Sequence, residues 1–355
     1  MKKPLKIIIS GIGNRALPRD PLKSNWKGWV ELINKMEEFH LVAAHDIDDS
    51  ALKRTAELGY LKPQQLYRSL EKMLKNIDCD AILVSNPAQF HAQTIQAALE
   101  RNLHMLVEKP FVSDVNEGKM LIREAKRRKI VMAVVQNWRY KDVGQLLRKA
   151  IKDNLIGGIG HIFFRYLRNR ENPRYPSYIF REKSPLLYAM GIHHLDLFRY
   201  ILDDDFASVS GNSFKPPWSF YKSDTGVNLF LKTKKGASVV YSGTISSLNN
   251  VIPQESLLID GDMGSLVNES QWLEPPLYFY PKEKKEGINL SKEIKNTDIY
   301  TQYNIADQRI LKNFYLAVVA GIKPACDASD ALRSAVAVEA CHSACQTGKT
   351  VYLRY

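Results

Sequence analysis

The stretch KIIISGIGNRA, residues 6–16, decides the fold, because it joins a compact apolar strand directly to a glycine-rich turn. Gly11 allows the tight turn, Gly13 allows a pyrophosphate to approach the backbone closely, and Ala16 takes the third, close-packed position of a G-x-G-x-x-A pattern. Backbone N–H groups in such a turn bind phosphate oxygens. The pattern is weak by itself, but one that directly follows a strand indicates a dinucleotide-binding loop.

The first 135 residues alternate between short apolar runs and amphipathic stretches with helical periodicity. Strand, helix and strand at this spacing require right-handed crossovers, which build a parallel sheet that is buried on both faces. This half is therefore predicted to be a doubly wound α/β domain. The predicted strands are Lys6–Ser10, Leu41–His45, Ala81–Val84, Met105–Val107 and Ile130–Val135, and the predicted helices are Trp26–Phe39, Asp49–Leu58, Leu70–Lys75, Ala88–Arg101 and Val115–Arg128.

After Tyr140 the pattern changes to runs that alternate apolar and polar residues with period two. Thr233–Gly236 and Gly261–Gly264 lie between such runs and predict tight turns, which join antiparallel neighbours. Two α/β domains are thus predicted: a doubly wound dinucleotide-binding domain over 1–137, and a domain with a large open, mostly antiparallel sheet over 138–355. The second contains the predicted helices Asp142–Asn154, Gln302–Ala320 and Ser329–Gln346 and the predicted strands Ile159–Leu167, Val227–Lys232, Ala237–Ser246, Ser256–Asp260 and Ser265–Asn268.

Two prolines, Pro18 and Pro21, lengthen the glycine-rich loop, because a helix that continued from the turn would meet both. The helix is expected to begin near Ser24 as its N-cap. Asp46 ends the second strand, where an acidic residue accepts hydrogen bonds from the adenosine ribose and repels a 2′-phosphate, which favours NAD over NADP. Arg15 keeps NADP open, because its guanidinium could pair with that phosphate. The alternative for Asp46 is a turn residue before the next helix.

The composition is that of a soluble globular protein. Of 355 residues 45% are hydrophobic and 25% are charged, and no window offers the roughly 18 apolar residues of a membrane helix. Fifty Lys and Arg against 38 Asp and Glu give a net charge of +12. These basic residues are scattered, so a solvated surface is favoured over nucleic-acid or membrane binding. Four cysteines are few for this length, which favours a cytoplasmic location and buried thiols over disulfides or a metal site.

Polar motifs stand at the predicted carboxyl ends of two further strands, the edge at which open α/β sheets bind ligands. SNP at 85–87, with His91 four residues on, follows the third strand, and EKP at 108–110 follows the fourth. NWRY at 137–140 and GIHHLD at 191–196 come later. Together with the glycine-rich loop, these motifs resemble the Gfo/Idh/MocA oxidoreductase family over nearly the whole chain, and Glu-Lys-Pro is the most specific of them.

The resemblance implies a dehydrogenase that moves a hydride between nicotinamide and a hydroxyl-bearing carbon of a sugar, cyclitol or related compound. It also implies that Lys109 assists, since a partly desolvated lysine beside a cationic ring has a depressed pKa, which suits proton exchange. Glu108 would orient Lys109 or contact the nicotinamide ribose. His193 is the second expected acid–base group, although family members often carry Asp four residues earlier, where this chain has Ala189. His194 lies about 100° further around a helix, which favours a core position for it.

The expected cofactor is NAD, with NADP as the alternative, and the expected substrate is a small polyhydroxy compound that could be anionic. Cofactor contacts are predicted at Gly11, Ile12, Gly13, Asn14, Arg15, Asp46, Ser85, Asn86, Pro87, His91 and Glu108. Substrate contacts are predicted at Lys109, Asn137, Arg139, His193 and Asp196, and no metal is expected. Five arginines between 165 and 181 could hold a carboxylate or phosphate of the substrate, or else form a solvated loop or a subunit contact.

Two other functions stay open on the same fold. The first is a non-catalytic NAD-binding sensor, which Ala189 in place of the family acid motivates and which intact Lys109 and His193 argue against. The second is an NAD-dependent glycoside hydrolase, which begins with the same hydride step. The resemblance further implies that the open sheet serves as an oligomer surface, so a homodimer or homotetramer is expected.

Overall fold

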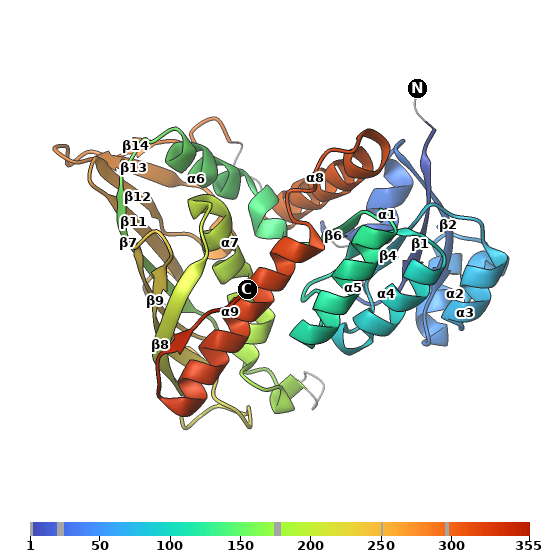
Figure 1. The fold of residues 1–355 in the computed structure, drawn as a ribbon, viewed down its shortest axis with the longest axis horizontal. Coiled ribbons are helices and arrows are strands. Elements are labelled where there is room, and N and C mark those ends of the chain that lie inside the picture. Colours follow the sequence, from blue (N-terminus) through green and yellow to red (C-terminus); the bar gives the residue numbers. More distant parts are fainter. Residues whose placement is uncertain (1–2, 20–24, 174–178, 250, 295–297) are drawn as a thin grey trace. The chain divides into compact units, whose positions relative to one another are not determined.

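The computed structural model describes residues 3–19, 25–173, 179–249, 251–294 and 298–355 (Figure 1). The chain forms two compact units. Unit 1 contains Met1–Tyr140 and Tyr300–Leu332, and unit 2 contains Lys141–Ile299 and Arg333–Tyr355. The chain therefore returns to unit 1 after most of unit 2 has been built. The single predicted boundary between 137 and 138 does not include this return.

Unit 1 is built on a six-stranded sheet whose neighbouring strands are all parallel. The order β3-β2-β1-β4-β5-β6 is that of a doubly wound dinucleotide-binding fold, with its switch point between β1 and β4. This confirms the fold predicted for the first half, except that β3, with two residues, is too short to be predicted. The strands are β1 (Leu5–Ser10), β2 (Phe39–His45), β3 (Leu66–Tyr67), β4 (Ala81–Val84), β5 (His104–Val107) and β6 (Met132–Val134).

Helices cover both faces of this sheet, because successive strand residues point to opposite sides. Ile7 and Ile9 of β1 pack in one core with α1, α2 and α8, whereas Ile8 packs in the other with α3, α4 and α5. α8 lies in the returning segment, and its Phe314 shares a core with Leu106 of β5. The return therefore completes the cover of one sheet face. These helices are α1 (Gly28–Lys35), α2 (Asp49–Glu57), α3 (Leu70–Asn76), α4 (His91–Glu100), α5 (Val115–Arg127) and α8 (Ile299–Ala320).

α1 is shorter than the predicted helix Trp26–Phe39. It begins at Gly28, which has a φ of +66° and where a Cβ would lie 2.7 Å from the carbonyl oxygen of Ala16. It ends at Lys35, because Phe39 already starts β2. The expectation that no helix continues from the glycine-rich turn is confirmed. The predicted N-cap, Ser24, lies outside the described residues, as does Pro21.

Unit 2 contains a nine-stranded sheet in the order β14-β13-β12-β11-β7-β10-β9-β8-β15. β7 and β10 are parallel, and the other neighbours in the described sheet are antiparallel, so the predicted mostly antiparallel sheet is confirmed. Both predicted hairpin turns are present. The strands are β7 (Ile159–Leu167), β8 (Phe206–Phe214), β9 (Gly226–Thr233), β10 (Ser238–Thr244), β11 (Glu255–Gly261), β12 (Gly264–Asn268), β13 (Leu277–Pro281), β14 (Ile288–Asn289) and β15 (Val351–Tyr352).

One face of this second sheet packs against helix α7 (Ile192–Leu202). Phe164 and Tyr166 of β7 point to that face, and each ring centre lies 4.7 Å from the ring centre of His194. The Nδ1 atom of His194 is 2.9 Å from the hydroxyl of Tyr241. The predicted core position of His194 is therefore confirmed. α6 (Asp142–Lys152) packs against α7, and α9 (Ala328–Thr347) begins in unit 1 and continues into unit 2.

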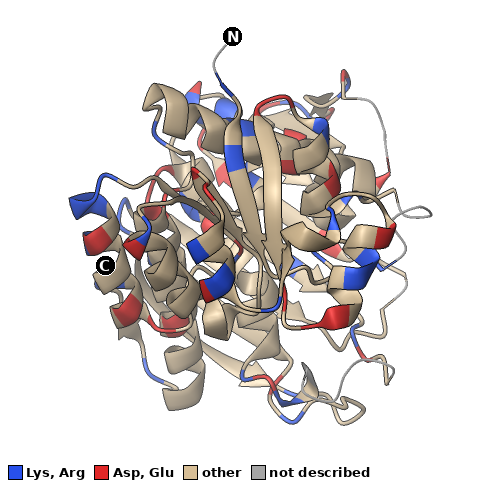
Figure 2. Ribbon diagram, turned by 90° about the vertical axis from the view of Figure 1, so that its right-hand side faces the viewer, with Lys and Arg blue, Asp and Glu red and all other residues tan. Residues whose placement is uncertain are grey.

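Basic and acidic side chains are intermingled along the chain. Figure 2 shows blue and red segments alternating over the helices and loops of the side that faces the viewer. Among the described residues, no helix combines the length and the apolar character that crossing a membrane requires.

Candidate active site

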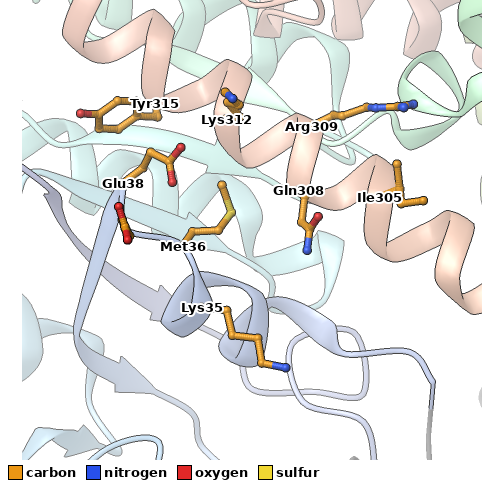
Figure 3. Close-up of a pocket in the computed structure, with 9 residues that line it drawn as sticks. Lys35, Met36, Glu38, Ile305, Gln308, Arg309, Lys312 and Tyr315 are labelled. Carbon is orange, nitrogen blue, oxygen red and sulfur yellow. The ribbon is translucent and has the colours of Figure 1, made fainter.

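The carboxyl ends of β1, β4 and β5 meet at one edge of the unit 1 sheet, and the three motif loops follow them. A groove of about 700 Å³ lies at the opposite edge, where α1 ends and β2 begins (Figure 3). Acidic and basic side chains both line it, among them Lys35, Glu38, Arg309 and Lys312. The groove is thus separate from the predicted site residues, and the carboxyl edge is the candidate active site.

The glycine-rich loop lies against the loop after β4. Gly11 has a φ of +96°, and a Cβ on it would lie 2.3 Å from the backbone nitrogen of Asn86. A side chain at this position would therefore push the two loops apart. Gly13 differs, because a Cβ built on it meets no atom within 4 Å. Gly11 thus serves the protein's own packing, and Gly13 leaves room beside the backbone.

The turn after Gly13 presents unused backbone donors. The amides of Ala16 and Leu17 both donate to the carbonyl of Gly13, which closes a single helical turn. In the described part of the chain, the amides of Gly13, Asn14 and Arg15 donate to no protein group. Successive unused N–H groups at a strand end are the groups with which such loops bind an anion. Together with the open space at Gly13, they fit a pyrophosphate.

Asp46 connects the end of β2 to the glycine-rich loop. Its Oδ2 accepts the amide N–H of Ile12 at 2.5 Å, and its Oδ1 accepts the amide N–H of Asp48 at 2.9 Å. The second bond belongs to the turn before the next helix, which is the alternative role of Asp46, and the ribose contact stays a prediction. A carboxylate has about four acceptor positions, so two remain for ribose hydroxyls.

The loop after β4 carries polar atoms that find no protein partner. The Oγ of Ser85 and the Oδ1 of Asn86 are both buried without a hydrogen bond to any described residue. The Nδ2 of Asn86 is held by the hydroxyl of Thr94 at 2.8 Å, which fixes the direction of the amide. Buried polar atoms of this kind are uncommon and indicate a ligand or water that completes them. Pro87 follows and is exposed.

His91 braces the loops after β4 and β5. Its Nε2 lies 2.8 Å from the carbonyl oxygen of Asn86, and its Nδ1 lies 2.9 Å from the carbonyl oxygen of Pro110. Burial lowers the pKa of His91, so the neutral ring donates one N–H at a time. Both ring nitrogens therefore face protein carbonyls, and the structure gives His91 a positioning role rather than a direct cofactor contact.

Glu108 ties the glycine-rich loop to the end of β5. Its Oε1 accepts from the Nε of Arg15 at 2.8 Å and from the indole N–H of Trp29 at 2.9 Å. Its Oε2 accepts the backbone N–H of Lys109 at 3.2 Å. Arg15 also forms a two-pronged pair with the fully buried Asp307 of α8, at 2.6 and 2.7 Å. Two carboxylates thus neutralise Arg15, which argues against its pairing with a 2′-phosphate, and its predicted cofactor contact stays a prediction.

Sequence reasoning did not find Asp307 or Trp29. The Arg15 guanidinium lies over the Trp29 ring, 4.4 Å from its centre. Burial opposes the charge of Arg15, but Asp307 and Glu108 outweigh it and raise the pKa of Arg15. The sequence carries no signal for the partnership with Asp307, because that residue follows Arg15 by 292 positions.

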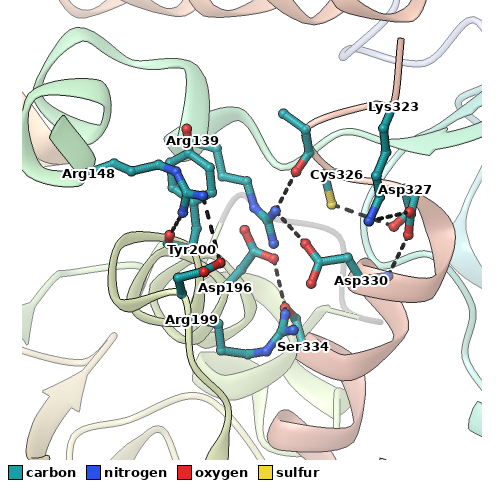
Figure 4. Close-up of polar contacts among 12 residues, drawn as sticks. Arg139, Arg148, Asp196, Arg199, Tyr200, Lys323, Cys326, Asp327, Asp330 and Ser334 are labelled. Carbon is teal, nitrogen blue, oxygen red and sulfur yellow. Dashed lines mark hydrogen bonds and ion pairs between the residues drawn. The ribbon is translucent and has the colours of Figure 1, made fainter. Parts of the chain in front are cut away.

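Arg139 and Asn137 follow β6 in unit 1. The Nη1 of Arg139 donates to the carbonyl oxygen of Ala325 at 2.7 Å and to the carboxylate of Asp330, toward which it points in Figure 4. Arg139 thus holds the returning segment, residues 300–332, next to the residues that follow β6. The sequence predicted a substrate contact for Arg139 and did not predict this structural role. The Oδ1 of Asn137 is buried without a partner among the described residues, and its substrate contact stays a prediction.

His193 lies in the first turn of α7 in unit 2 and is largely buried. The preceding residues, Leu187–Gly191, form a π-helical turn that contains Ala189. A wider turn alters the α-helical spacing on which the family's acid–histidine pattern depends. π-turns of this kind are frequent at functional sites, and the acid–base role of His193 stays a prediction.

Asp196 is fully buried in unit 2, and its Oδ1 accepts the hydroxyl of Ser334 at 2.7 Å. That hydroxyl in turn accepts from the Nη1 of Arg199 at 2.7 Å, as Figure 4 shows. Arg199 also pairs with Asp205 at 2.9 Å. Asp196 therefore joins α7 to α9, and its predicted contact with a sugar hydroxyl stays a prediction.

The remaining sequence predictions concern arginines and metals. Arg174 lies outside the described residues, as do the tyrosines Tyr175 and Tyr178 of the same segment. No group of three or more His, Cys, Asp or Glu side chains suited to a metal ion occurs in the described ranges.

The family models agree with this architecture. Residues 11–136 match the model described as oxidoreductase family, NAD-binding Rossmann fold, and residues 148–353 match the oxidoreductase family C-terminal alpha/beta domain. The chain belongs to the Gfo/Idh/MocA oxidoreductase family. Gfo/Idh/MocA membership makes it an NAD-dependent oxidoreductase, and the unused amides, the space at Gly13 and the unpartnered Ser85 and Asn86 atoms fit that cofactor.

Individual relatives within the family are distant. An uncharacterized protein of Sinorhizobium fredii is 24% identical over 71% of each chain. The D-apiose dehydrogenase of Paraburkholderia graminis is 22% identical over 64% of this chain and 60% of its own length. The myo-inositol 2-dehydrogenase of Thermotoga maritima is 22% identical over 51% of this chain and 52% of its own length. The matched stretch thus spans little more than half of the named dehydrogenases.

Solved structures share the fold over nearly the whole chain. An oxidoreductase from Agrobacterium radiobacter, in complex with NAD+, L-tartaric acid and magnesium, has a TM-score of 0.85 at 17% identity, covering 98% of both chains. An inositol dehydrogenase homolog from Azotobacter vinelandii, in complex with NADH and myo-inositol, has a TM-score of 0.81 at 17% identity, covering 99% of this chain and 98% of the other.

Proposed function

We propose that the protein transfers a hydride between NAD and a hydroxyl-bearing carbon of a sugar, cyclitol or related polyhydroxy compound. The observation that carries the proposal is the carboxyl edge of unit 1, where unused amides from Gly13 to Arg15 adjoin the rigidly held Glu108-Lys109-Pro110 loop. NAD supplies the hydride acceptor when it is bound. The named relatives that act on D-apiose and myo-inositol support the substrate class.

We assign Lys109 as the base that accepts the proton of the substrate hydroxyl as the hydride departs. Its backbone N–H is held by Glu108, and His91 holds the carbonyl of the next residue, Pro110. Because the backbone is held on both sides, the Lys109 side chain starts from a fixed point, which favours the positioning that general base catalysis requires. His193 is assigned as the second acid–base group on the substrate.

NAD is proposed as the preferred coenzyme over NADP. Asp46 places a carboxylate at the end of β2, where the adenosine ribose lies in this fold, and Arg15 is already neutralised by Glu108 and Asp307. A 2′-phosphate would therefore meet a negative charge without a compensating Arg15. A cytoplasmic location is proposed as well, and the four free cysteines support it.

A turnover assay tests the proposed function. The purified protein, supplied with NAD and a panel of neutral polyols, aldoses and sugar acids, is expected to form NADH with at least one compound. NAD binding without turnover on the whole panel would favour the sensor instead. Release of an aglycone from a glycoside without net NADH would identify the hydrolase.

A homodimer through the open sheet of unit 2 is proposed as the assembly. Phe163 of β7 and Phe230 of β9 are 46% and 59% exposed on the face away from α7. The register places them in one cross-strand row with Val240 between them and Leu258 on the other side of Phe163. An apolar row of this length on a sheet face is suited to burial against a second sheet.

The charges beside this row make the face complementary to a second copy of itself. Lys232 lies at the β9 end of the next row, and Asp260 lies at the β11 end of that same row. A two-fold axis parallel to the strands, between β7 and β10, places β9 of one copy over β11 of the other. Lys232 then faces the partner's Asp260, and Phe230 faces the partner's Leu258.

Replacing Phe230 with aspartate is expected to shift the protein to the monomer in sedimentation velocity, because a charge would be buried in the apolar row. Lys232→Glu is expected to weaken the dimer, and adding Asp260→Lys is expected to restore it. Met120→Asp, at an exposed position on α5, is the matched control. A monomeric wild type, or a dimer that Phe230→Asp leaves intact, would refute this interface.

A further inference from the structure

Three side chains at the end of β7 present polar groups on the face that packs against α7. Tyr166 points to this face, since its ring lies against the ring of His194, with 4.7 Å between the two ring centres. The chain stays paired beyond the strand, with the amides of Arg168 and Arg170 donating to the carbonyls of Thr244 and Ile245 at 2.9 and 2.7 Å. Glu255 is the cross-strand partner of Tyr166, so the pair between Arg168 and Glu255 places Arg168 on the side of Tyr166. Arg170 lies two residues further along, and we place it on the same side by period-two alternation.

Two of these groups are buried and lack a partner. The hydroxyl of Tyr166, on a fully buried residue, and the Nε of Arg168 have no hydrogen-bond partner of normal geometry among the described residues. Both atoms carry an N–H or O–H that can donate. Buried donors left unsatisfied are uncommon in proteins, and two neighbouring ones call for a shared acceptor. An anionic oxygen accepts from both and forms stronger bonds than a neutral acceptor does.

Arg168 is held in place by other groups and cannot turn away. Its Nη2 pairs with the buried Glu255 at 2.9 Å, and its Nη1 donates to Gln254. Its guanidinium also lies over the Trp272 ring, 4.5 Å from the ring centre. The other Glu255 oxygen accepts the amide N–H of Trp272 at 2.8 Å. The Glu255 carboxylate thus neutralises the charge of Arg168, but it does not accept a hydrogen bond from the Nε of Arg168.

Arg170 supplies a positive charge that the protein does not neutralise. Its guanidinium pairs with no carboxylate in the described ranges. The guanidinium carbon of Arg168 lies 5.8 Å from the centre of the Tyr166 ring. Burial and the Glu255 carboxylate raise the pKa of Tyr166 to about 12, while the positive charges of Arg170 and Arg168 act to lower it. The nearest acidic side chain in sequence, Glu171, is occupied by Ser246 and by the amide of Phe220.

We propose that Tyr166, Arg168 and Arg170 form an anion cradle that binds a carboxylate or phosphate group of the substrate. The cradle lies on the sheet face covered by α7, the helix that carries His193, and the proposal that the anion belongs to a polyhydroxy substrate rests on the proposed function. It narrows the substrate to acidic compounds, such as aldonic acids or sugar phosphates. Of the arginines in the segment 165–181, the cradle includes Arg168 and Arg170. Arg165 points to the other face of the sheet by alternation and lies outside the cradle.

Isothermal titration of the NADH-loaded protein tests the cradle, because NADH occupies the glycine-rich loop and prevents oxidation of the ligand. The probes are D-gluconate, D-glucose 6-phosphate and the neutral D-glucitol, which lacks the carboxylate of gluconate. At least one anionic probe is expected to bind ten-fold or more tightly than D-glucitol, and the stronger of the two shows whether carboxylate or phosphate is preferred. Added salt is expected to weaken the anionic probe alone.

Arg170→Gln and Tyr166→Phe are each expected to weaken the preferred anionic probe about ten-fold and to leave D-glucitol unchanged, since each removes one charge-assisted contact. Tyr166→Phe removes a hydroxyl that has no protein partner, so the variant keeps its packing. Arg354→Gln removes an equal charge from an exposed position of unit 2 and serves as the control. Equal binding of anionic and neutral probes, or unchanged binding in Arg170→Gln, would overturn the cradle. Absence of NADH formation would overturn the proposed function alone.

Discussion

Replacing Lys109 with alanine is expected to lower kcat by about 10²- to 10⁴-fold, the range that a positioned proton-transfer group contributes. The affinity for NAD is expected to stay within a few-fold of the wild type. The reason is that the backbone amides of the glycine-rich loop are the proposed pyrophosphate contacts, and the Glu108 interactions that hold this loop do not use the Lys109 side chain. Steady-state NADH formation and NAD titration measure the two quantities separately.

The pH profile adds a second readout for Lys109. A wild-type rate that rises with pH as an amine loses its proton is expected to become flat in Lys109→Ala over the same range. Lys119→Ala, an exposed lysine on α5, is the matched control and is expected to behave as the wild type. A Lys109→Ala variant with nearly full kcat would contradict the catalytic assignment and leave His193 as the principal group.

Replacing Gly13 with valine is expected to weaken NAD binding about 100-fold or more, while the protein still folds. A Cβ at Gly13 meets no protein atom within 4 Å, and its φ is not positive, so the side chain enters the space beside the unused amides. At a concentration of 100 times the Kd, NAD stabilises the wild type by about 2.7 kcal/mol, and a 100-fold weaker site would gain only about 0.4 kcal/mol. Thermal melts with and without NAD report this difference.

Gly11→Ala is the contrasting variant, because its Cβ would lie 2.3 Å from Asn86 and its φ of +96° disfavours a side chain. It is expected to lower the free energy of unfolding by about 1–3 kcal/mol even without NAD. Within one motif, Gly13 thus leaves space for the ligand, and Gly11 allows the two loops to pack together. A Gly13→Val protein that NAD stabilises as strongly as the wild type would show that the pyrophosphate binds elsewhere.

Sequence motifs located the ends of the right strands, but they did not say where each side chain points. His91, Arg139 and Asp196 were all predicted to contact ligands, and each has protein partners that the sequence does not reveal. In the same way, the sequence allows Arg15 to be a phosphate ligand, whereas in the structure it pairs with Asp307 on α8, near the end of the chain. A strand-end position is a local property, whereas a hydrogen-bond partner depends on segments that are distant in sequence.

The doubly wound sheet, the open second sheet and the glycine-rich loop could all be predicted from the sequence, because periodicity, turn residues and strand-end motifs act within a few neighbouring residues. The return of α8 to cover a face of the first sheet could not be predicted, since an apolar helical stripe does not specify the sheet that it covers. The different roles of Gly11 and Gly13, and the lack of partners for the Tyr166 hydroxyl and the Arg168 Nε, likewise became apparent only from the structure. Open space and unsatisfied donors are properties of the packed chain.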